Sequence, residues 1–333
     1  MTERPTPVVL AIDIEPDDPE FPPGSVAPWL GFERCVPLFD DIRDRLARAT
    51  GWPVRLSWFL RMDPQVEQGY GSATWAAERY KMQFEHLRRS GDEIGLHSHA
   101  WRWDKDASRW IVDLDNDSWV EDCARTSFEA YNNAFGERCR AHRAGDRFMS
   151  NGLLAVLREL EVEVDLTPEP GMRGVNMARS RPHTADIPDM ALVPRVPYIP
   201  SPTDWREPDQ NPEQASLLMV PLTSADPGPL LGPWRAAVRR LRNGGRVLHR
   251  PLLPWSPKVG PFLWDVVARD LRSGELSTLA FAMRSHAALE ETSRNALLAS
   301  IAALERHELV KSLAFVTASE ARAAYAKDQR AER

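Results

Sequence analysis

The sequence predicts an α/β fold, and within that class it favours a βα barrel over a doubly wound open sheet. Apolar runs of strand length alternate with stretches of helical periodicity along most of the 333 residues, a pattern typical of parallel sheets and barrels. Three predicted strands carry apolar side chains on one face and small, then ionisable, side chains on the other. A barrel explains this asymmetry, because helices cover its outer strand face while its active site lies at the carboxyl-terminal mouth. An open sheet covered on both sides would bury those charges.

Each predicted element follows from the spacing of its apolar residues. Strands are predicted at residues 8–14, 54–60, 93–97, 139–143, 162–167, 217–222, 279–286 and 312–317. Helices are predicted at residues 36–49, 74–89, 119–135, 151–160, 234–241, 261–271 and 289–307. Gly51, Gly91 and Gly136 stand where three of these helices should end, because glycine readily adopts the backbone conformation that terminates a helix.

Segment 168–212 interrupts the alternation. It contains ten prolines and no sustained periodicity, and proline removes backbone donors and fixes φ, so neither a helix nor a central strand is expected. Such an insertion is either a lid or binding loop, or a packed loop without a role in binding. We predict one domain over residues 1–333, with 168–212 as a Pro-rich loop insertion and 321–333 as a charged tail.

Composition limits the class of function. The net charge of −6 offers no basic surface for phosphates, so nucleic acid is not expected as a partner. No run approaches the roughly 18 apolar residues of a membrane span, and the N-terminus lacks an apolar signal region. The three cysteines, Cys35, Cys123 and Cys139, are far apart and are predicted to be reduced, buried thiols. We therefore expect a cytoplasmic protein, and the sequence does not indicate an oligomeric state.

Residues 93–101, EIGLHSHAW, carry the clearest chemical signal. Side chains alternate along a strand, so Gly95, His97 and His99 should share one face. Two imidazoles that converge at a strand end form a partial metal site, which a carboxylate and a water would complete. Trp101 follows directly, and a tryptophan near a polar site can stack on a sugar ring. Most tryptophans pack in cores, however, so Trp101 is only a candidate substrate-binding residue.

The strand parities bring further ionisable side chains to the same predicted mouth. The faces opposite the apolar ones end in Asp13 and Glu15, in Asp165, and in Arg284 and His286. Two imidazoles and one carboxylate leave a position open for water, as catalytic zinc sites do. A metal there lowers the pKa of that water and polarises a substrate carbonyl, while a second carboxylate and a histidine can act as general base and acid. The whole predicted set is Asp13, Glu15, His97, His99, Arg143, Asp165, Arg284 and His286. Each member also has a plainer structural interpretation, such as an ion pair for Arg143.

In this order, these residues resemble the polysaccharide deacetylase superfamily with the NodB homology domain, also called carbohydrate esterase family 4. Residues 11–15 (AIDIE) are similar to its first motif, and residues 93–101 to its metal-binding second motif in a His-x-His-x-Trp variant. Residues 142–145 (HRAG) resemble the third motif, and residues 217–223 and 282–286 occupy the places of the later ones. The resemblance covers nearly the whole chain.

The resemblance implies a distorted (β/α)7-type barrel, with fewer than eight βα units, and metal-dependent removal of acetyl groups from an N-acetylated sugar. By that resemblance Asp13 would be the general base, Arg143 would hold it ionised by charge pairing, and His286 would protonate the leaving amine. His97 and His99 would bind a divalent metal. Zinc is expected in the first place, with cobalt, iron, nickel or manganese as alternatives.

Three departures from the family pattern leave parts of the site open. The two usually adjacent aspartates are separated here by Ile14, Trp101 stands where a second metal histidine is usual, and Arg284 stands near the place of the last histidine. The third metal ligand is therefore either Glu15 or Asp17. Either Arg284 or His286 faces the substrate, and the candidate substrate-binding residues are Trp101, Asp165 and Arg284.

The leading hypothesis is a metal-dependent carbohydrate N-deacetylase, a hydrolase of carbon–nitrogen bonds other than peptide bonds, acting on a glycan or glycan precursor. One alternative is a metal-free amide or cyclic-amide hydrolase on the same barrel. Another is a non-catalytic glycan-binding or scaffold protein, which the altered first and last motifs motivate. Because one fold hosts many functions, the site has to decide among them.

Overall fold

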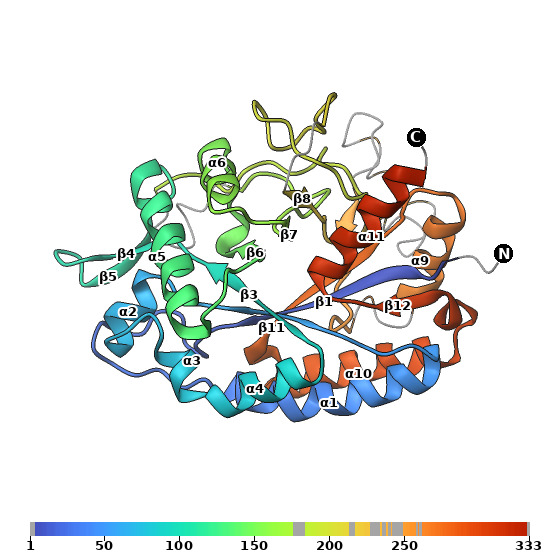
Figure 1. The fold of residues 1–333 in the computed structure, drawn as a ribbon, viewed down its shortest axis with the longest axis horizontal. Helices are drawn as coiled ribbons and strands as arrows, with labels where there is room; N and C mark the ends of the chain where they lie inside the picture. The colour runs from blue at the N-terminus through green and yellow to red at the C-terminus, as the bar shows by residue number, and fades with distance from the viewer. Residues whose placement is uncertain are drawn as a thin grey trace.

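A parallel sheet that curls into a distorted (β/α)7-type barrel forms the centre of the molecule (Figure 1). The computed structural model describes residues 4–175, 184–212, 217–226, 249–257 and 262–331, and also residues 234, 238, 241 and 259. The strands run in the order β11-β1-β2-β3-β6-β7-β8, and β12 also pairs with β1. Their bounds are β1 (Thr6–Ile14), β2 (Ser57–Leu60), β3 (Glu93–Ser98), β6 (Ala141–Ala144), β7 (Val164–Asp165), β8 (Leu218–Met219), β11 (Leu279–Arg284) and β12 (Leu313–Phe315). The predicted fold class is confirmed.

Helices cover the outside of this sheet, and two short antiparallel pairs stand beside it. The helices are α1 (Leu30–Thr50), α2 (Pro64–Tyr70), α3 (Trp75–Arg79), α4 (Lys81–Arg89), α5 (Asp117–Phe135), α6 (Asn151–Glu159), α9 (Leu263–Arg272), α10 (Glu291–Arg306) and α11 (Ala318–Ala331), with 3-10 turns η1 (Gly145–Arg147), η4 (Ser285–Ala288) and η5 (Glu308–Ser312). The pairs are β4 (Trp101–Asp104) with β5 (Arg109–Val112), and β9 (Ser224–Ala225) with β10 (Arg250–Pro251). Neither pair was predicted from the sequence, and neither was α2.

Local chemistry sets several helix ends. Gly51 and Gly136 end α1 and α5 in the left-handed conformation, at φ 83° and 68°, as glycine permits. Asp63 begins α2, because its side chain accepts hydrogen bonds from the N–H groups of Gln65 and Val66, which have no partner within the helix. The predicted helix 74–89 is divided at Tyr80 into α3 and α4.

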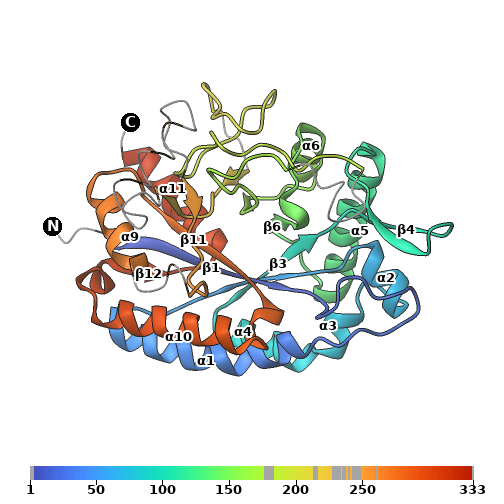
Figure 2. The same ribbon diagram turned by 180° about the vertical axis from the view of Figure 1, so that it is seen from behind.

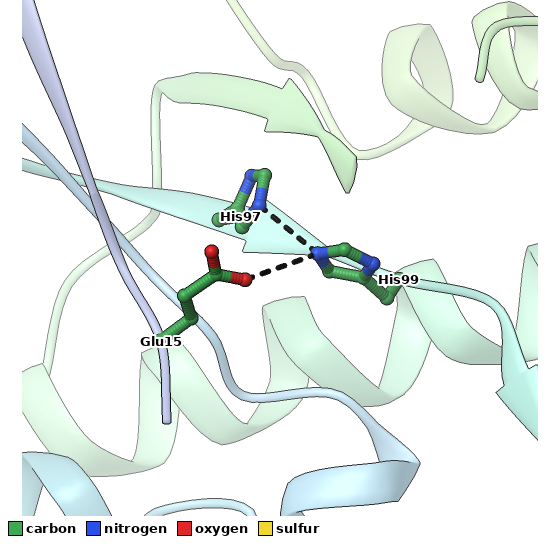
Figure 3. Close-up of side chains that lie close together, drawn as sticks. All are labelled: Glu15, His97 and His99. Carbon is green, nitrogen blue, oxygen red and sulfur yellow. Dashed lines mark hydrogen bonds and ion pairs between the residues drawn. The ribbon is translucent and has the colours of Figure 1, made fainter. Parts of the chain in front are cut away.

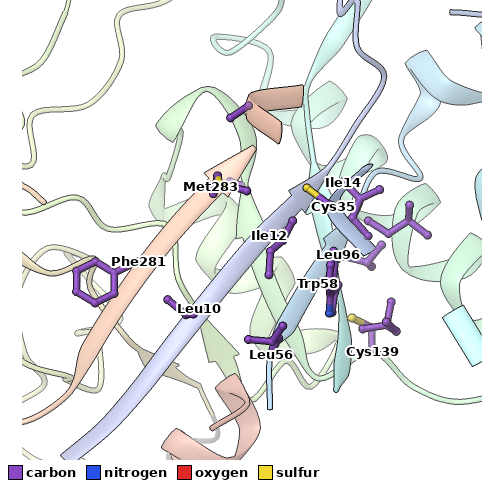
Figure 4. Packing of buried hydrophobic residues seen from close by; sticks show 14 of the residues in the cluster. Leu10, Ile12, Ile14, Cys35, Leu56, Trp58, Leu96, Cys139, Phe281 and Met283 are labelled. Atoms are coloured by element: carbon purple, nitrogen blue, oxygen red, sulfur yellow. The ribbon is translucent and has the colours of Figure 1, made fainter. Parts of the chain in front are cut away.

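The outer face of the sheet carries the larger of two apolar cores. Helices α1 and α10 lie side by side along this face in both views (Figure 1, Figure 2). Burying such side chains stabilises a fold by about 25 cal/mol per Å² of apolar surface, so this layer accounts for most of the packing. Its members on or beside the strands include Leu10, Ile12, Ile14, Leu56, Trp58, Leu96, Phe281 and Met283 (Figure 4). Those of β1, β3 and β11 lie on the apolar faces that the sequence predicted.

The inner face carries a second, smaller core that closes the lower part of the barrel. Its members are mostly small or β-branched: Val9, Ala11, Phe59, Ala141, Val164, Leu166, Leu218, Val220, Leu222, Ala280, Ala282, Ala318 and Ala321. Two hydrogen bonds join the segment after β8 to β11, from Thr223 N to Ala280 O and from Ala280 N to Thr223 Oγ1, each 2.8 Å. Among the described residues, these two hydrogen bonds close the barrel between this segment and β11.

The first turn of α11 fills the amino-terminal end of the barrel. Ala318 and Ala321 are buried in the inner core. Ala318 N donates to Ser57 Oγ at 2.9 Å and Ser319 N donates to Glu93 Oε2 at 3.0 Å, which fixes the helix to the starts of β2 and β3. The segment predicted as a charged tail is therefore helical over most of its length.

Two predictions about strands are wrong. In the strand predicted at 162–167 the parity is reversed from Val164 onward, because Val164 and Leu166 belong to the inner core and Asp165 lies on the opposite face. The strand predicted at 279–286 ends at Arg284, and His286 lies in η4 instead. The helix predicted at 234–241 falls largely outside the described residues.

Among the described residues, no helix is both long and apolar enough to cross a membrane. All three cysteines are buried and unpaired. Within the described part of 168–212 the backbone forms only isolated bridges, such as Tyr198 with Met219 at the edge of the sheet.

Candidate metal centre

Glu15, His97 and His99 gather at the carboxyl-terminal mouth of the barrel (Figure 3). Glu15 follows β1, His97 belongs to β3, and His99 comes directly after it. One potential ligand atom from each lies within 4.8 Å of the other two, and all three side chains are buried. The separation is 3.0 Å between His97 Nε2 and His99 Nε2, and 3.7 Å between His99 Nε2 and Glu15 Oε2.

Hydrogen bonds to the far nitrogens orient both imidazoles. His97 Nδ1 lies 2.9 Å from the backbone oxygen of Arg143, and His99 Nδ1 lies 2.7 Å from Asp146 Oδ2. Both of these oxygens are acceptors, so both Nδ1 atoms are the donors. In the neutral rings each Nε2 is then left with its lone pair facing the other.

This arrangement fits a cation. Two lone pairs 3.0 Å apart repel each other unless a metal ion or a proton lies between them, and nitrogens bound to one tetrahedral zinc at 2.0–2.1 Å lie about 3.3 Å apart. Burial lowers the pKa of His97 well below its ordinary value, and any positive charge on His99, together with the guanidinium groups of Arg143 and Arg61, acts in the same direction. His97 is therefore held in the neutral form that a metal ligand requires, and the carboxylate of Glu15 adds a charged oxygen ligand.

Asp13 and Arg143 form a buried ion pair beside this cluster. Arg143 Nε donates to Asp13 Oδ2 at 3.1 Å, while Asp13 Oδ1 is buried without a hydrogen-bond partner among the described residues. Burial raises the pKa of Asp13 above its ordinary value; Arg143 opposes this shift and Glu15 adds to it. Charge pairing by Arg143 thus moderates the effect of burial rather than overcoming it.

Arg143 is itself held by two further acceptors. Its Nη1 donates to Leu166 O at 2.7 Å and its Nη2 donates to Glu169 Oε1 at 3.3 Å. Glu169 belongs to the start of the Pro-rich insertion, so that segment contributes directly to the site. The guanidinium is therefore fixed relative to β1, β7 and the insertion at once.

Arg284 and His286 lie between Glu15 and the solvent. Arg284 Nε is 3.4 Å and His286 Nδ1 is 3.9 Å from Glu15 Oε1. The side chain of Arg284 is 50% exposed and that of His286 is 31% exposed, so both can be reached from solvent. A Cβ at Gly31 would lie 2.6 Å from the His286 backbone, so a glycine in α1 is what lets η4 approach this closely.

Three of the predicted site residues lie apart from the cluster. Asp17 begins α1 by accepting from Leu30 N at 2.7 Å and Gly31 N at 2.9 Å. Trp101 is 2% exposed and its indole donates to Asp146 Oδ2 at 2.7 Å, so its ring is not an open stacking surface. Asp165 is fully buried on the outer side of the sheet, away from the mouth.

Asp165 instead belongs to a Ser–His–Asp chain. Ser98 Oγ lies 2.8 Å from His142 Nε2, and His142 Nδ1 lies 2.8 Å from Asp165 Oδ2. The contacts are those of a serine hydrolase triad, but His142 and Asp165 are fully buried and the ring of Phe128 in α5 lies 6.0 Å from the imidazole. The chain is a structural network that joins β3, β6 and β7.

Three residues beside the cluster were not predicted from the sequence: Arg61, Asp146 and Glu169. Arg61 continues the inner-face parity of Ser57 and Phe59 beyond β2, so the rule applied to three other strands would have identified it. Asp146 directly follows the third motif, which is a weaker signal. Glu169 carries no sequence signal beyond its place after the strand at 162–167.

No protein-family model matches the sequence, and no curated protein sequence matches it. Solved structures do match the fold. A Parabacteroides distasonis protein, provisionally named a glycoside hydrolase/deacetylase, has a TM-score of 0.56 at 13% identity, over 97% of this chain and 72% of its own. A Pseudomonas aeruginosa PAO1 protein, provisionally named a polysaccharide deacetylase, has a TM-score of 0.54 at 13% identity, over 97% and 91%. Puue allantoinase has a TM-score of 0.52 at 14% identity, over 96% and 90%.

At these identities the likeness establishes the fold. The chain has a barrel of the kind found in proteins named as a polysaccharide deacetylase and a glycoside hydrolase/deacetylase, which the motif resemblance led us to expect. The allantoinase has the same fold, so the architecture alone does not select the substrate.

Proposed function

We propose that the protein is a metal-dependent hydrolase that removes acetyl groups from an N-acetylated carbohydrate, either a glycan or a glycan precursor. The observation that carries the proposal is the buried cluster of Glu15, His97 and His99 with the Asp13–Arg143 pair beside it. A divalent metal bound there, zinc in the first place, supplies Lewis acidity and a water of lowered pKa. Glu15 takes the place of the third ligand, since Asp17 is engaged at the start of α1.

The chain's own residues then have distinct roles. Asp13 takes a proton from the attacking water, and its raised pKa brings it closer to the operating pH, where a general base is most efficient. Arg143 holds Oδ2 of Asp13 by a hydrogen bond, so Oδ1 is left to accept the proton from the water. His286 protonates the leaving amine. The amide C–N bond breaks, the carbonyl carbon gains the water oxygen, and acetate and a free amine result.

Arg284 is the proposed substrate contact of the set. It is half exposed at the end of β11 and lies only 3.4 Å from Glu15 Oε1, so it borders the cluster without being sequestered. Its remaining N–H groups can donate to hydroxyl or carboxyl oxygens of a sugar. Trp101 and Asp165 are too deeply buried for this role.

A metal-free amide or cyclic-amide hydrolase is the second candidate. A proton shared between His97 Nε2 and His99 Nε2 would also relieve the repulsion of their lone pairs at 3.0 Å, and Puue allantoinase shares the fold. In that case His99 would be an imidazolium, stabilised by Asp146 and Glu15 on either side.

Elemental analysis and acetate release together separate these candidates. The purified protein would be loaded in turn with zinc, cobalt, nickel, manganese and iron(II), and assayed on N-acetylhexosamine oligomers, on N-acetylated glycan precursors and on allantoin. His97→Ala is the test variant. His86→Ala is the matched control, because His86 is a half-exposed histidine of α4 that pairs with Asp40.

Stoichiometric metal and acetate release in the wild type and in His86→Ala, both lost in His97→Ala, would support the proposal. Turnover of a cyclic amide without metal would support the second candidate. Sugar binding with no turnover of any substrate, unchanged in Asp13→Ala, would instead identify a non-catalytic glycan-binding or scaffold protein.

A further inference from the structure

Asp146 joins two aromatic residues of the site through one oxygen atom. His99 Nδ1 and Trp101 Nε1 each lie 2.7 Å from Asp146 Oδ2. The rings of His99 and Trp101 meet nearly at right angles, with centroids 5.9 Å apart. All of these side chains are buried, so the contacts are charge-assisted hydrogen bonds shielded from water, which are stronger than neutral exposed ones.

The backbone around Asp146 is unusual in a way that favours this contact. Asp146 and Arg147 have φ values of 49° and 56°, in the left-handed region that non-glycine residues rarely adopt. Such conformations persist only where the surroundings impose them, and they cluster at functional sites. A Cβ at Gly145 would lie 2.2 Å from His99 Nε2, so the turn preceding Asp146 is shaped to accommodate the imidazole.

We propose that Asp146 is a positioning residue that holds His99 in the Nδ1–H tautomer, so that its Nε2 lone pair faces His97 and Glu15. Trp101 in turn fixes the carboxylate by donating to the same oxygen. The inference rests on the proposed function only in taking that lone pair as a metal ligand. Carboxylates bound to the second nitrogen of a ligating histidine set its tautomer and raise its basicity in this way.

This arrangement gives Trp101 a structural role beside the cluster. The family resemblance places a second metal histidine there, and this chain has an indole instead. Trp101 supports the cluster indirectly, by orienting the carboxylate that orients His99. The loss of one potential ligand is thus accompanied by a constraint on another.

A second carboxylate–histidine pair in the same molecule provides a matched control. His142 Nδ1 lies 2.8 Å from Asp165 Oδ2, but its Nε2 is already engaged with Ser98 Oγ. The pair therefore has the same local chemistry and burial without a free nitrogen. Substituting Asp165 therefore shows how zinc affinity responds to the loss of a buried carboxylate–histidine hydrogen bond on which no proposed metal ligand depends.

The test compares Asp146→Asn, Trp101→Phe and Asp165→Asn with the wild type. Zinc affinity is measured by competition with a chromophoric chelator, and the coordination of cobalt(II) by its visible absorption. Nitrogen-15 NMR of the imidazoles, recorded without metal, reports which nitrogen of His99 carries the proton. An asparagine can either accept from or donate to Nδ1, so Asp146→Asn permits both tautomers.

We expect Asp146→Asn to weaken zinc binding about 10- to 100-fold, to change the cobalt spectrum, and to give a mixture of His99 tautomers. Trp101→Phe should act in the same direction by a smaller factor, and Asp165→Asn should leave zinc affinity unchanged. Wild-type affinity and a single tautomer in Asp146→Asn would overturn the proposal, as would an equal loss of affinity in Asp165→Asn. If Asp146→Asn does not fold, the zinc affinity and the His99 tautomer are measured in Trp101→Phe instead, and these two results decide.

The NMR readout separates this inference from the proposed function. If the wild type binds no metal ion, the metal-dependent activity is wrong. A His99 tautomer that is single in the wild type and mixed in Asp146→Asn would still support the positioning role. An unchanged tautomer would overturn it regardless of metal binding.

Discussion

Arg143 and Asp13 meet as a buried ion pair at the mouth of the barrel, with Arg143 Nε 3.1 Å from Asp13 Oδ2. Their strands are not neighbours: β1 and β6 are separated in the sheet by β2 and β3. The pair therefore reaches across the inside of the curled sheet, above the inner core. One oxygen of Asp13 is fixed by this contact, and the other has no partner among the described residues. A carboxylate held in this way presents one defined oxygen to an incoming water.

Asp13→Asn should lower kcat by about 10²- to 10⁴-fold, because it removes the general base while keeping the shape of the side chain. Zinc content should remain at the wild-type level, since the ligands proposed are Glu15, His97 and His99. Steady-state acetate release and elemental analysis measure the two quantities. A kcat within about three-fold of the wild type would show that Asp13 is not the base.

Metal binding should stabilise the fold. An ion that binds only the folded chain adds about 2.7 kcal/mol to the free energy of unfolding at a concentration 100 times its Kd. Urea unfolding with and without zinc measures this difference. His97→Ala should abolish it, while the exposed-site control His86→Ala should retain it. An equal zinc effect in both variants would place the ion elsewhere.

Ser98→Ala should leave kcat within about two-fold of the wild type. The hydroxyl contacts His142 on the outer side of the sheet, where α5 covers the network, so it is not a nucleophile despite the triad-like contacts. Removing it leaves a buried imidazole nitrogen unpartnered and should cost about 1–3 kcal/mol in the free energy of unfolding. Labelling of the wild type by a serine-directed phosphonate at Ser98 would contradict this view.

The ion pair between Arg45 of α1 and Glu305 of α10 should make stability depend on pH. Arg45 Nε and Nη2 donate to the two oxygens of Glu305 at 2.8 and 2.9 Å, which lowers the pKa of Glu305 from its ordinary value of 4.5. Such a carboxylate stabilises the fold above its unfolded pKa, and the contribution is lost as pH falls through the folded pKa. Glu305→Gln should therefore cost about 0.5–1 kcal/mol near pH 7 and much less near pH 3.

Urea unfolding at both pH values tests this, with Glu308→Gln as the control. Glu308 lies 3.1 Å from Arg272 in an ion pair that is largely exposed on both sides, where little net stabilisation is expected. Equal losses for Glu305→Gln at the two pH values would show that packing, rather than charge, is responsible.

Strand parity predicted the cluster of Glu15, His97 and His99 because β1, β3 and β11 are long enough for their two faces to differ. Asp13, His97 and Arg284 extend the inner face of their strands, as the register of the sheet shows. The same rule failed for Asp165, since both faces of β7 are buried and its polar residue is satisfied by His142. Alternation alone does not distinguish a polar group that faces a cavity from one that is paired within the structure.

Other parts of the site depend on contacts that no local pattern contains. Asp146 contacts His99, which lies 47 residues earlier in the chain. The contact depends on a left-handed turn that no sequence pattern predicts. The sequence allows Trp101 to be an exposed stacking surface, whereas in the structure its ring is buried and its indole donates to Asp146. Arg61 is different, because it continues the alternation of Ser57 and Phe59 one residue beyond the predicted strand, so the sequence does indicate which face it is on.

The docking of α11 at the base of the barrel has a consequence for biosynthesis. Ala318 and Ala321 complete the inner core, yet they follow every described strand of the sheet in chain order. A nascent chain that has already emerged through β12 still exposes the apolar base of its barrel, because the helix that covers it has not yet left the ribosome. Contacts between such distant segments are slow to form, and exposed apolar surface favours aggregation during synthesis. We therefore expect the yield of folded protein to depend on chaperones and on the speed of translation.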